Sequence, residues 1–285
     1  MCTIEAMMIL VQIVQLQQNV RPVARERAAG GKHSLLTEKQ NWLETLKRDG
    51  RPDRLVNQFR PLVLFTDEPV YTYLFGSRVR GSTTVDRFGT TFLFPEDAPG
   101  PMPHVTEENK VLPDITRWRE YVKIPDLRAN CAQGWEEAEA KAAQIDRGST
   151  PLMCMLLNGV FEQLHFLMGM EDAMCNLLVE PEATEELISA LMDWRMEWAR
   201  LLVEHLHPDV MLSHDDWGSK DTMFMSPDTW RTLFKPYYAT LYGYLKENGV
   251  TVIHHADSFL EPIAEDMAEI GVDIWQGVLP SNDIV

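Results

Sequence analysis

Three stretches of the sequence share one design: PLMCMLLN at residues 151–158, DVMLSHDD at 209–216 and VTVIHHAD at 250–257. Each contains a short apolar run without polar alternation. Helical patterns follow them at about 160–178, 184–206 and 226–248. Strands that are apolar on both faces and alternate with helices are typical of a parallel sheet that is buried on both sides. The pattern therefore predicts an α/β fold, either a (β/α)8 barrel or an open doubly wound sheet.

The ends of these strands favour the barrel. No glycine-rich turn opens a helix after any of them, so the dinucleotide-binding fingerprint is missing. Polar residues follow the strands instead: Asn158, then His214, Asp215 and Asp216, then His255 and Asp257, and finally Gln276 after a short run at 273–275. In a barrel the carboxyl ends of the strands meet on one face, where active sites lie. We therefore expect a TIM (β/α)8-type barrel whose active face carries these side chains.

The part of the chain before residue 150 is less regular. Residues 1–33 do not match the rest of the chain and are expected to be an N-terminal extension outside the fold, which leaves 34–285 as the barrel domain. Thr37 and Gln40 form a capping-box pattern that opens a helix. Residues 62–65 and 83–94 are expected to be extended, the latter as a strand or a hairpin. About six of the eight strands of a barrel can thus be placed, so we expect a barrel truncated at its C-terminus.

Composition excludes some classes of partner. The 285 residues carry a formal net charge of −17, with 43 acidic against 26 basic side chains. This balance argues against binding to nucleic acid or to an anionic membrane surface, because both require a basic face. The apolar stretch 6–14 is too short to span a bilayer. Four scattered cysteines without a CxxC pair indicate no disulfide framework, so we expect a reducing, cytoplasmic location.

His255 and Asp257 form the most specific element of the sequence. Because alternate side chains of an extended segment point the same way, both can enter one cavity. An imidazole and a carboxylate are suitable ligands for Zn²⁺ or another divalent metal. A third ligand would come from Asp215, Asp216, Glu162 or residues that are absent from this sequence. The alternative is that the two residues hydrogen-bond to each other or cap the following helix.

Other residues near the strand ends are candidates for catalysis or substrate binding. Asp215 and Asp216 offer adjacent carboxylates, of which one can be a general base, a metal ligand or an anchor for a cationic group, and the other a helix N-cap. Trp217 could form the wall of an aromatic or tetrapyrrole-sized pocket, although such residues are as often core packing. His254 is expected to face the helices. Further candidates for substrate contact are Asn158, Gln276 and, in the proline-rich loop at 95–104, His104.

A longer set of motifs resembles a known family. The motifs are Asp215-Asp216-Trp217-Gly218-Ser219, Met225-Ser226-Pro227, Trp230, Lys235-Pro236-Tyr237-Tyr238, Leu245-Lys246-Glu247-Asn248-Gly249, Val252-Ile253-His254-His255 and Ile270-Gly271-Val272-Asp273-Ile274. In this order they resemble the uroporphyrinogen decarboxylase superfamily, most densely over about 150–280. The resemblance implies a (β/α)8 barrel, and two activities share that fold.

One activity is the decarboxylation of uroporphyrinogen in porphyrin and haem biosynthesis. Enzymes of this branch carry an arginine-rich N-terminal signature, R-P-V-W-x-M-R-Q-A-G-R-Y, whose arginines hold the acidic side chains of the substrate. In this chain Arg21-Pro22-Val23 is followed by Ala24-Arg25-Glu26, and the rest of the signature is missing. The resemblance to the decarboxylases is therefore the weaker one.

The other activity belongs to cobalamin-dependent methyltransferases, which move methyl groups between a methylated substrate, a corrinoid protein and a thiol. They share the Asp-Asp-x-Gly-Ser turn and usually carry a zinc-binding His-x-Cys where this chain has His255-Ala256-Asp257. We therefore expect a methyltransferase that transfers a methyl group from a small, for example methoxylated, substrate to a partner corrinoid protein. The expected zinc ligands are His255, Asp257 and Glu162, and the expected catalytic residues are Asp215, Asp216 and His255. The decarboxylase is the alternative, and an inactive fragment or a binding protein is the third possibility.

Overall fold

The structure is a computed structural model that describes residues 35–57, 59–76, 79–98 and 100–284. The extension predicted at 1–33 lies outside these described residues. At the centre is a five-stranded parallel sheet with the order β1-β5-β6-β7-β8. Its strands are β1 (Val63–Leu64), β5 (Leu152–Leu156), β6 (Val210–His214), β7 (Thr251–His255) and β8 (Ile274–Gln276). The three apolar stretches that predict the fold are therefore neighbouring strands of one parallel sheet.

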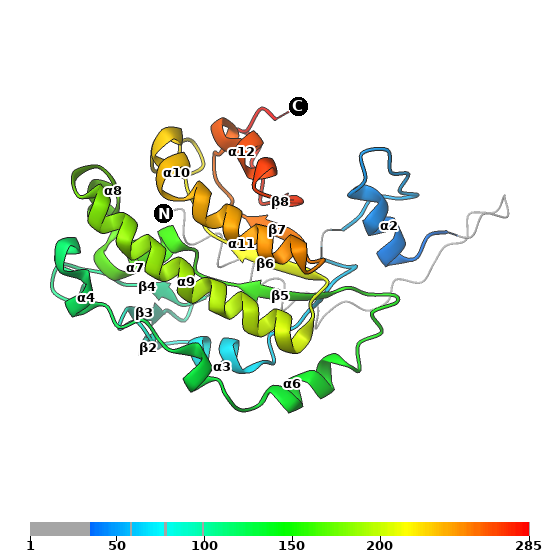
Figure 1. Cartoon of the computed structure of the whole chain (residues 1–285), viewed down its shortest axis with the longest axis horizontal. Coiled ribbons are helices and arrows are strands. Elements are labelled where there is room, and N and C mark those ends of the chain that lie inside the picture. The colour runs from blue at the N-terminus through cyan, green and yellow to red at the C-terminus, as the bar shows by residue number, and fades with distance from the viewer. Residues whose placement is uncertain (1–34, 58, 77–78, 99, 285) are drawn as a thin grey trace.

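Helices connect the parallel strands, and Figure 1 shows α9 and α11 side by side across one face of the sheet. The connecting helices are α7 (Val160–Met168), α8 (Met170–Val179), α9 (Pro181–Leu206), α10 (Pro227–Leu233), α11 (Lys235–Glu247), the 3₁₀ helix η2 (Glu261–Ile263) and α12 (Ala264–Glu269). Two of the predicted helices are divided. Gly169, with φ of 92°, separates α7 from α8. Pro236, which has no N–H to continue a helix, lies in the first turn of α11 just after α10 ends.

The N-terminal part supplies a second sheet, which is antiparallel and has the order β2-β3-β4. The elements of this part are α2 (Glu38–Thr45), α3 (Pro69–Phe75), β2 (Ser82–Val85), β3 (Thr91–Phe94), β4 (Met102–Pro103), η1 (Ile115–Arg117), α4 (Trp118–Tyr121), α5 (Leu127–Asn130) and α6 (Trp135–Ala142). Thr37 caps α2 through the predicted capping box with Gln40. Residues 83–94 form the hairpin β2–β3 and not a barrel strand, because Gly89, with φ of 95°, lies in a tight turn after Asp86. The described residues thus hold five parallel strands rather than about six, and within them β1 and β8 remain the edges of the sheet.

The two faces of the parallel sheet pack against different layers. Side chains such as Cys154 and Met211 belong to the large core cluster that includes the helices. The alternate positions, such as Met155 and Leu212, belong to a smaller cluster on the opposite face. Trp42 of α2 joins this smaller cluster, so a helix far from the strands in sequence covers part of the second face.

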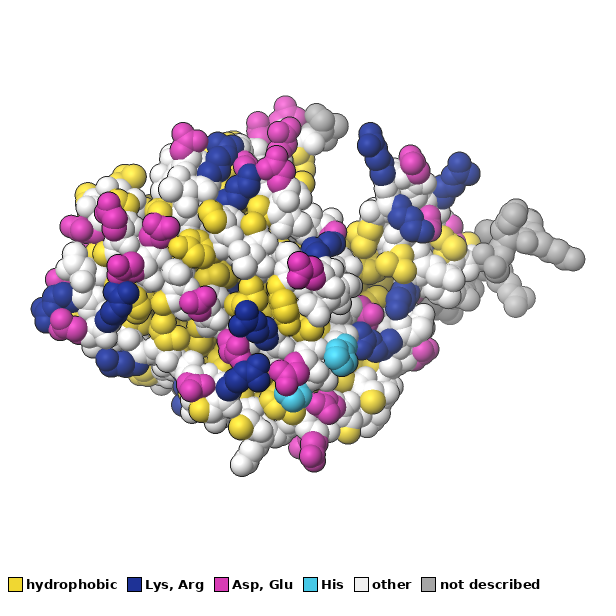
Figure 2. All heavy atoms as spheres, viewed as in Figure 1, with side chains coloured by type: hydrophobic (Ala, Val, Ile, Leu, Met, Phe, Trp, Pro, Cys, Tyr) yellow, Lys and Arg dark blue, Asp and Glu magenta, His cyan; other side chains and the backbone are white. Residues whose placement is uncertain are grey.

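The surface carries both signs of charge. Figure 2 shows acidic and basic side chains intermixed across the face in view, with apolar side chains between them. Within the described part of the chain, no helix combines the length and the apolar character that crossing a membrane requires.

Glu68 is a buried carboxylate that caps α3 and makes stability depend on pH. It accepts the N–H groups of Val70 (2.6 Å) and Tyr71 (2.8 Å). Burial raises the pKa of Glu68 to about 7, against the opposing effect of these hydrogen bonds. Between about pH 4.5 and pH 7, Glu68 is therefore protonated in the folded protein and ionised in the unfolded chain. The proton contributes stability that is fully present below about pH 4.5 and is lost as the pH rises through 7.

Replacing Glu68 with glutamine tests this contribution, because glutamine has no proton to lose. Relative to Glu68→Gln, the wild type is expected to lose about 3 kcal/mol of unfolding free energy between pH 4.5 and pH 8. Urea denaturation of both proteins across this range measures the difference. A difference that stays constant with pH would contradict a raised pKa.

Candidate metal centre

Polar side chains lie next to one another where three parallel strands end. His214 pairs in register with His255 across β6 and β7, and His255 pairs with Gln276 across β7 and β8. Because side chains alternate along a strand, these residues lie on the face of Leu212 and Ile253, away from the main helices. The rings of His214 and His255 stack with their centroids 4.5 Å apart. Of the strand-end cluster that the sequence predicts, His214, His255 and Gln276 thus lie together on one face of the sheet.

Asp216 completes the group that His255 and Asp257 begin. One donor atom from each of these three residues lies within 4.8 Å of the other two, and all three residues are buried. Oδ1 of Asp216 accepts hydrogen bonds from the backbone N–H of Asp257 (3.2 Å) and from the hydroxyl of Ser258 (3.4 Å), which joins the loops after β6 and β7. The structure does not bring the predicted third ligand, Glu162, into this group. Asp216 takes that place.

Nε2 of His255 has no hydrogen-bond partner among the described residues, and neither does Oδ2 of Asp216. The other ring nitrogen of His255, Nδ1, contacts Oε1 of Gln276. Because an amide oxygen only accepts, Nδ1 carries the proton and Nε2 the lone pair. Burial, together with the charge of His214, lowers the pKa of His255 to about 3. The ring is therefore neutral at pH 7, which is the form that binds a metal.

Asp216 lies among other carboxylates. Burial raises the pKa of Asp216 well above its ordinary value; the charge of His214 opposes this rise, and the charges of Glu162 and Asp257 add to it. A divalent cation would reverse this effect, because it favours the ionised carboxylates. One imidazole and two carboxylates form a donor set that fits an ion such as Zn²⁺, and two of its buried atoms, Nε2 of His255 and Oδ2 of Asp216, have no hydrogen-bond partner among the described residues.

His214 and Glu162 form a second buried pair beside this group. Nδ1 of His214 lies 2.7 Å from Oε2 of Glu162, which also accepts the N–H of Gly159 (2.8 Å) at the start of α7. Burial opposes charge on both residues, but their attraction raises the pKa of His214 to about 9 and lowers that of Glu162 to about 2. His214 is not among the predicted site residues. A signal for it exists in the sequence, since it holds on β6 the position that His255 holds on β7.

Asp215 does not face the metal group, contrary to its predicted catalytic role. Its carboxylate accepts hydrogen bonds from the backbone N–H groups of Phe161 (3.2 Å) and Glu162 (3.1 Å), from Nε1 of Trp217 (2.8 Å) and from the hydroxyl of Tyr238 (2.6 Å). Asp215 therefore anchors the first turn of α7 to the end of β6. Because consecutive side chains of an extended segment point to opposite sides, Asp216 reaches the metal group and Asp215 the helix layer.

Trp217 lies in the core and does not form the wall of an open pocket. None of its surface is exposed. Its ring stacks on His254 with a centroid distance of 4.2 Å, and it meets Trp230 and Tyr238 edge to face. The predicted contact of Trp217 with a substrate does not fit this position, because the ring has no exposed surface and packs against β7, α10 and α11.

The other predicted substrate-binding residues occupy different places. Gln276 contacts His255 at the metal group. Asn158 has φ of 53°, and its carbonyl accepts a hydrogen bond from Arg195 (2.8 Å) at the end of β5. His104 follows β4 in the antiparallel sheet, where it is exposed and belongs to neither group of possible ligands.

The sequence model of the family described as Uroporphyrinogen decarboxylase (URO-D) matches residues 83–277. The match covers more than half of the chain and contains every residue of the metal group. The chain belongs to the uroporphyrinogen decarboxylase family. This family has the TIM-barrel fold, and the five-stranded parallel sheet of this URO-D family protein is consistent with part of such a barrel. No curated protein matches the chain.

In this URO-D family protein, Arg195 of α9 holds the ends of β5 and β6 together behind the metal group. Its guanidinium is wholly buried. It donates hydrogen bonds to the carbonyls of Leu156 (2.9 Å), Asn158 (2.8 Å) and His214 (3.2 Å), and to the hydroxyl of Ser213 (2.9 Å). Hydrogen bonds from a charged donor are strong, so the strand ends are held in place without any contribution from a metal.

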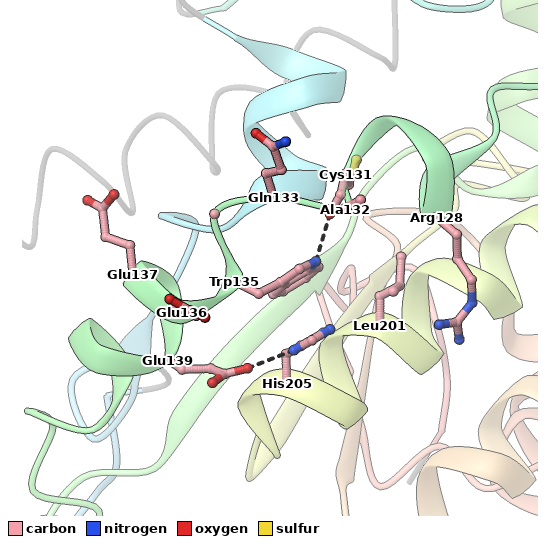
Figure 3. Close-up of a pocket in the computed structure, with 11 residues that line it drawn as sticks. Arg128, Cys131, Ala132, Gln133, Trp135, Glu136, Glu137, Glu139, Leu201 and His205 are labelled. Carbon is pink, nitrogen blue, oxygen red and sulfur yellow. Dashed lines mark hydrogen bonds and ion pairs between the residues drawn. The ribbon is translucent and has the colours of Figure 1, made fainter.

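A separate hollow of about 740 Å³ lies between α5, α6 and the C-terminal end of α9. Figure 3 shows Trp135 and His205 stacked face to face within it, with centroids 4.2 Å apart, and Glu139 in contact with Nδ1 of His205 (2.7 Å). Its lining includes none of the site residues predicted from the sequence. The hollow is therefore distinct from the candidate metal centre.

Proposed function

We propose that this URO-D family protein is a metal-dependent methyltransferase, which moves a methyl group from a small methylated substrate, such as a methoxylated compound, to a corrinoid carried by a partner protein. The observation that carries the proposal is the buried group of Asp216, His255 and Asp257, whose donor atoms lie within 4.8 Å of one another. The pair of His255 and Asp257 stands where the methyltransferases that the chain resembles carry His-x-Cys.

Zinc is the ion that we propose for this group. Nε2 of His255 and the carboxylates of Asp216 and Asp257 would hold it. A zinc ion bound there supplies Lewis-acid polarisation of a substrate oxygen. Because carboxylate donors are harder than thiolate, the group suits an oxygen-bearing substrate better than a thiol.

The residues around the group keep its donor atoms in position. Gln276 fixes the ring of His255 through Nδ1, so Nε2 stays available. The N–H of Asp257 and the hydroxyl of Ser258 fix Oδ1 of Asp216. In the proposed reaction the bond between the methyl carbon and the oxygen breaks, and the oxygen keeps the bonding electrons and takes up a proton from water. The reduced corrinoid of the partner protein would supply the electron pair of the new bond to the methyl carbon.

Decarboxylation of uroporphyrinogen is the competing function, and two features disfavour it. Glu162, Asp216 and Asp257 bring three carboxyl groups to the strand ends, and carboxyl groups supply no positive charge that would bind a polycarboxylate substrate. The sequence also lacks most of the arginine-rich signature that holds such a substrate in the decarboxylases it resembles. Both features favour the methyltransferase.

An assay of the full chain distinguishes the two functions. With zinc, a methoxylated aromatic compound and a reduced corrinoid protein, we expect methylated corrinoid and the demethylated hydroxyl compound in equal amounts. The visible absorption of the corrinoid and chromatography of the compound follow the reaction. With uroporphyrinogen as the substrate, we expect no product with fewer carboxylates. Decarboxylation without methyl transfer would refute the proposal and establish the alternative.

A further inference from the structure

A small cavity lies between the end of α3, the turn of the β2–β3 hairpin, α7 and α9. It has about 10 Å³ of room for the centre of a water-sized group, which is enough for one such group. The cavity shares no residue with the metal group or with the hollow beside α6. It is therefore a separate place in the molecule.

Gln163 of α7 borders this cavity with two polar atoms that lack partners. Its side chain is only 2% exposed, and every residue of α7 is buried. Neither Oε1 nor Nε2 of Gln163 has a hydrogen-bond partner among the described residues. Buried polar atoms without partners are unfavourable, and native proteins leave few of them. The amide of Gln163 therefore points to a bound group.

Trp194 of α9 borders the same cavity and also has a polar atom without a partner. The residue is 8% exposed, and its Nε1 finds no hydrogen-bond partner in the part of the chain that the structure describes. Its ring meets Phe88 of the hairpin turn edge to face, with centroids 5.1 Å apart, so the indole is held against the hairpin. A donor and an acceptor, both unpaired, thus border one small space.

Asn158 lies at the cavity where β5 has ended. Its φ of 53° belongs to a region that few residues other than glycine adopt, and asparagine is one of those that do. Arg195 holds the carbonyl of Asn158 in place (2.8 Å). The sequence predicts that Asn158 contacts a substrate, and this cavity is the enclosed space that the residue borders.

The unpaired atoms select the class of ligand. An indole N–H only donates a hydrogen bond, and an amide oxygen only accepts one. A hydroxyl group accepts from the first and donates to the second, whereas a ketone or ether oxygen can only accept. Leu74, Phe75 and Phe88 border the same space with apolar side chains, which suit the carbon skeleton that carries the hydroxyl.

We infer that this cavity binds the hydroxyl group of a small alcohol, with Nε1 of Trp194 donating to its oxygen and Oε1 of Gln163 accepting from its O–H. The inference does not rest on the proposed function, because it requires neither a metal ion nor methyl transfer.

Nuclear magnetic resonance of the full, ¹⁵N-labelled chain tests the inference with 2-propanol and acetone. The two compounds have the same shape, but only 2-propanol has a hydroxyl. We expect 2-propanol to shift the indole N–H resonance of Trp194 saturably, with a dissociation constant on the order of 10 mM. Acetone is expected to bind at least about tenfold more weakly, because it cannot donate to Gln163.

Trp230 is the internal control in the same spectrum. Its Nε1 is likewise buried and without a partner among the described residues, but it does not border the cavity. Its resonance is expected to stay in place with both compounds. Spectra of Trp194→Phe and Trp230→Phe assign the two resonances.

Gln163→Met keeps the length of the side chain and removes its polar atoms, so it is expected to weaken the binding of 2-propanol at least about tenfold. Gln133→Met is the matched control, because Gln133 lies in the separate hollow, and it is expected to bind as the wild type does. Trp194→Phe removes the N–H alone and provides a second test if Gln163→Met does not fold. Saturation transfer to the methyl protons of 2-propanol measures binding to that variant, which is also expected to be at least about tenfold weaker.

Two results would overturn the inference. A Trp194 resonance that 2-propanol does not shift saturably would mean that the cavity holds an ordered water only. Acetone that binds as well as 2-propanol, or binding that survives both Gln163→Met and Trp194→Phe, would mean that no hydroxyl connects the two side chains.

Discussion

Gly159→Ala is expected to destabilise the protein by about 3 kcal/mol or more. A Cβ at Gly159 would overlap the Cβ, the carboxyl carbon and Oδ1 of Asp215. Asp215 cannot move aside at low cost, because it is fully buried and holds the N–H groups of Phe161 and Glu162. Relief of the overlap would therefore separate the first turn of α7 from the end of β6.

Gly243→Ala provides the control for this substitution. Gly243 lies inside α11, and a Cβ added there meets nothing within 4 Å. Because alanine has the higher helix propensity, this variant is expected to gain up to about 1 kcal/mol of unfolding free energy. Denaturant unfolding of both variants measures the two values. A Gly159→Ala protein as stable as the wild type would show that Asp215 does not anchor α7.

His255→Ala is expected to lower methyl transfer at least about a hundredfold and to remove about one zinc ion per chain. Its Nε2 is buried, neutral and without a partner, and alanine offers no donor in its place. Metal analysis and the methyl-transfer assay measure the two effects. Thermal unfolding of the metal-free proteins shows whether the variant is folded.

Two further variants test whether the effect of His255→Ala is due to the loss of a metal ligand. Gln276→Ala keeps the ligand but removes the contact that fixes its ring, so zinc binding is expected to weaken about tenfold. His104→Ala is expected to change neither zinc binding nor activity, because His104 is exposed and follows β4 of the other sheet. Full activity of His255→Ala after removal of all metal would exclude a metal-dependent mechanism.

Part of the site could be predicted because successive side chains of a strand point to opposite faces of the sheet. His254 and His255 are consecutive residues of β7, and the sequence predicts that they face opposite sides. In the structure His254 stacks on Trp217 and contacts the hydroxyl of Tyr242 (2.8 Å) in the helix layer, whereas His255 joins Asp257 on the other face. The side on which a strand residue lies follows from its parity, which is a local property.

Residues 83–94 show where local patterns were insufficient. Their β-branched and aromatic composition predicts extended structure correctly, but the same composition suits a barrel strand and a hairpin. The turn at Gly89 and the pairing of β2 with β3 decide in favour of the hairpin. Likewise, the position of Trp217 after a strand is compatible with a pocket wall and with core packing. Its complete burial and its contacts with α10 and α11 show that it packs in the core.

By itself the sequence determined the parallel α/β architecture and the pair of His255 and Asp257, because both depend on spacing along one strand or between neighbouring elements. Only the tertiary structure decided which carboxylate joins that pair. Asp215 and Asp216 are adjacent in sequence, yet α7 packs against β6 so that Asp215 binds its backbone N–H groups and Asp216 faces His255. The same packing brings Glu162 to His214, 52 residues away, and not to His255. Such distances depend on the register of three strands and on the position of a helix, which no local pattern in the sequence encodes.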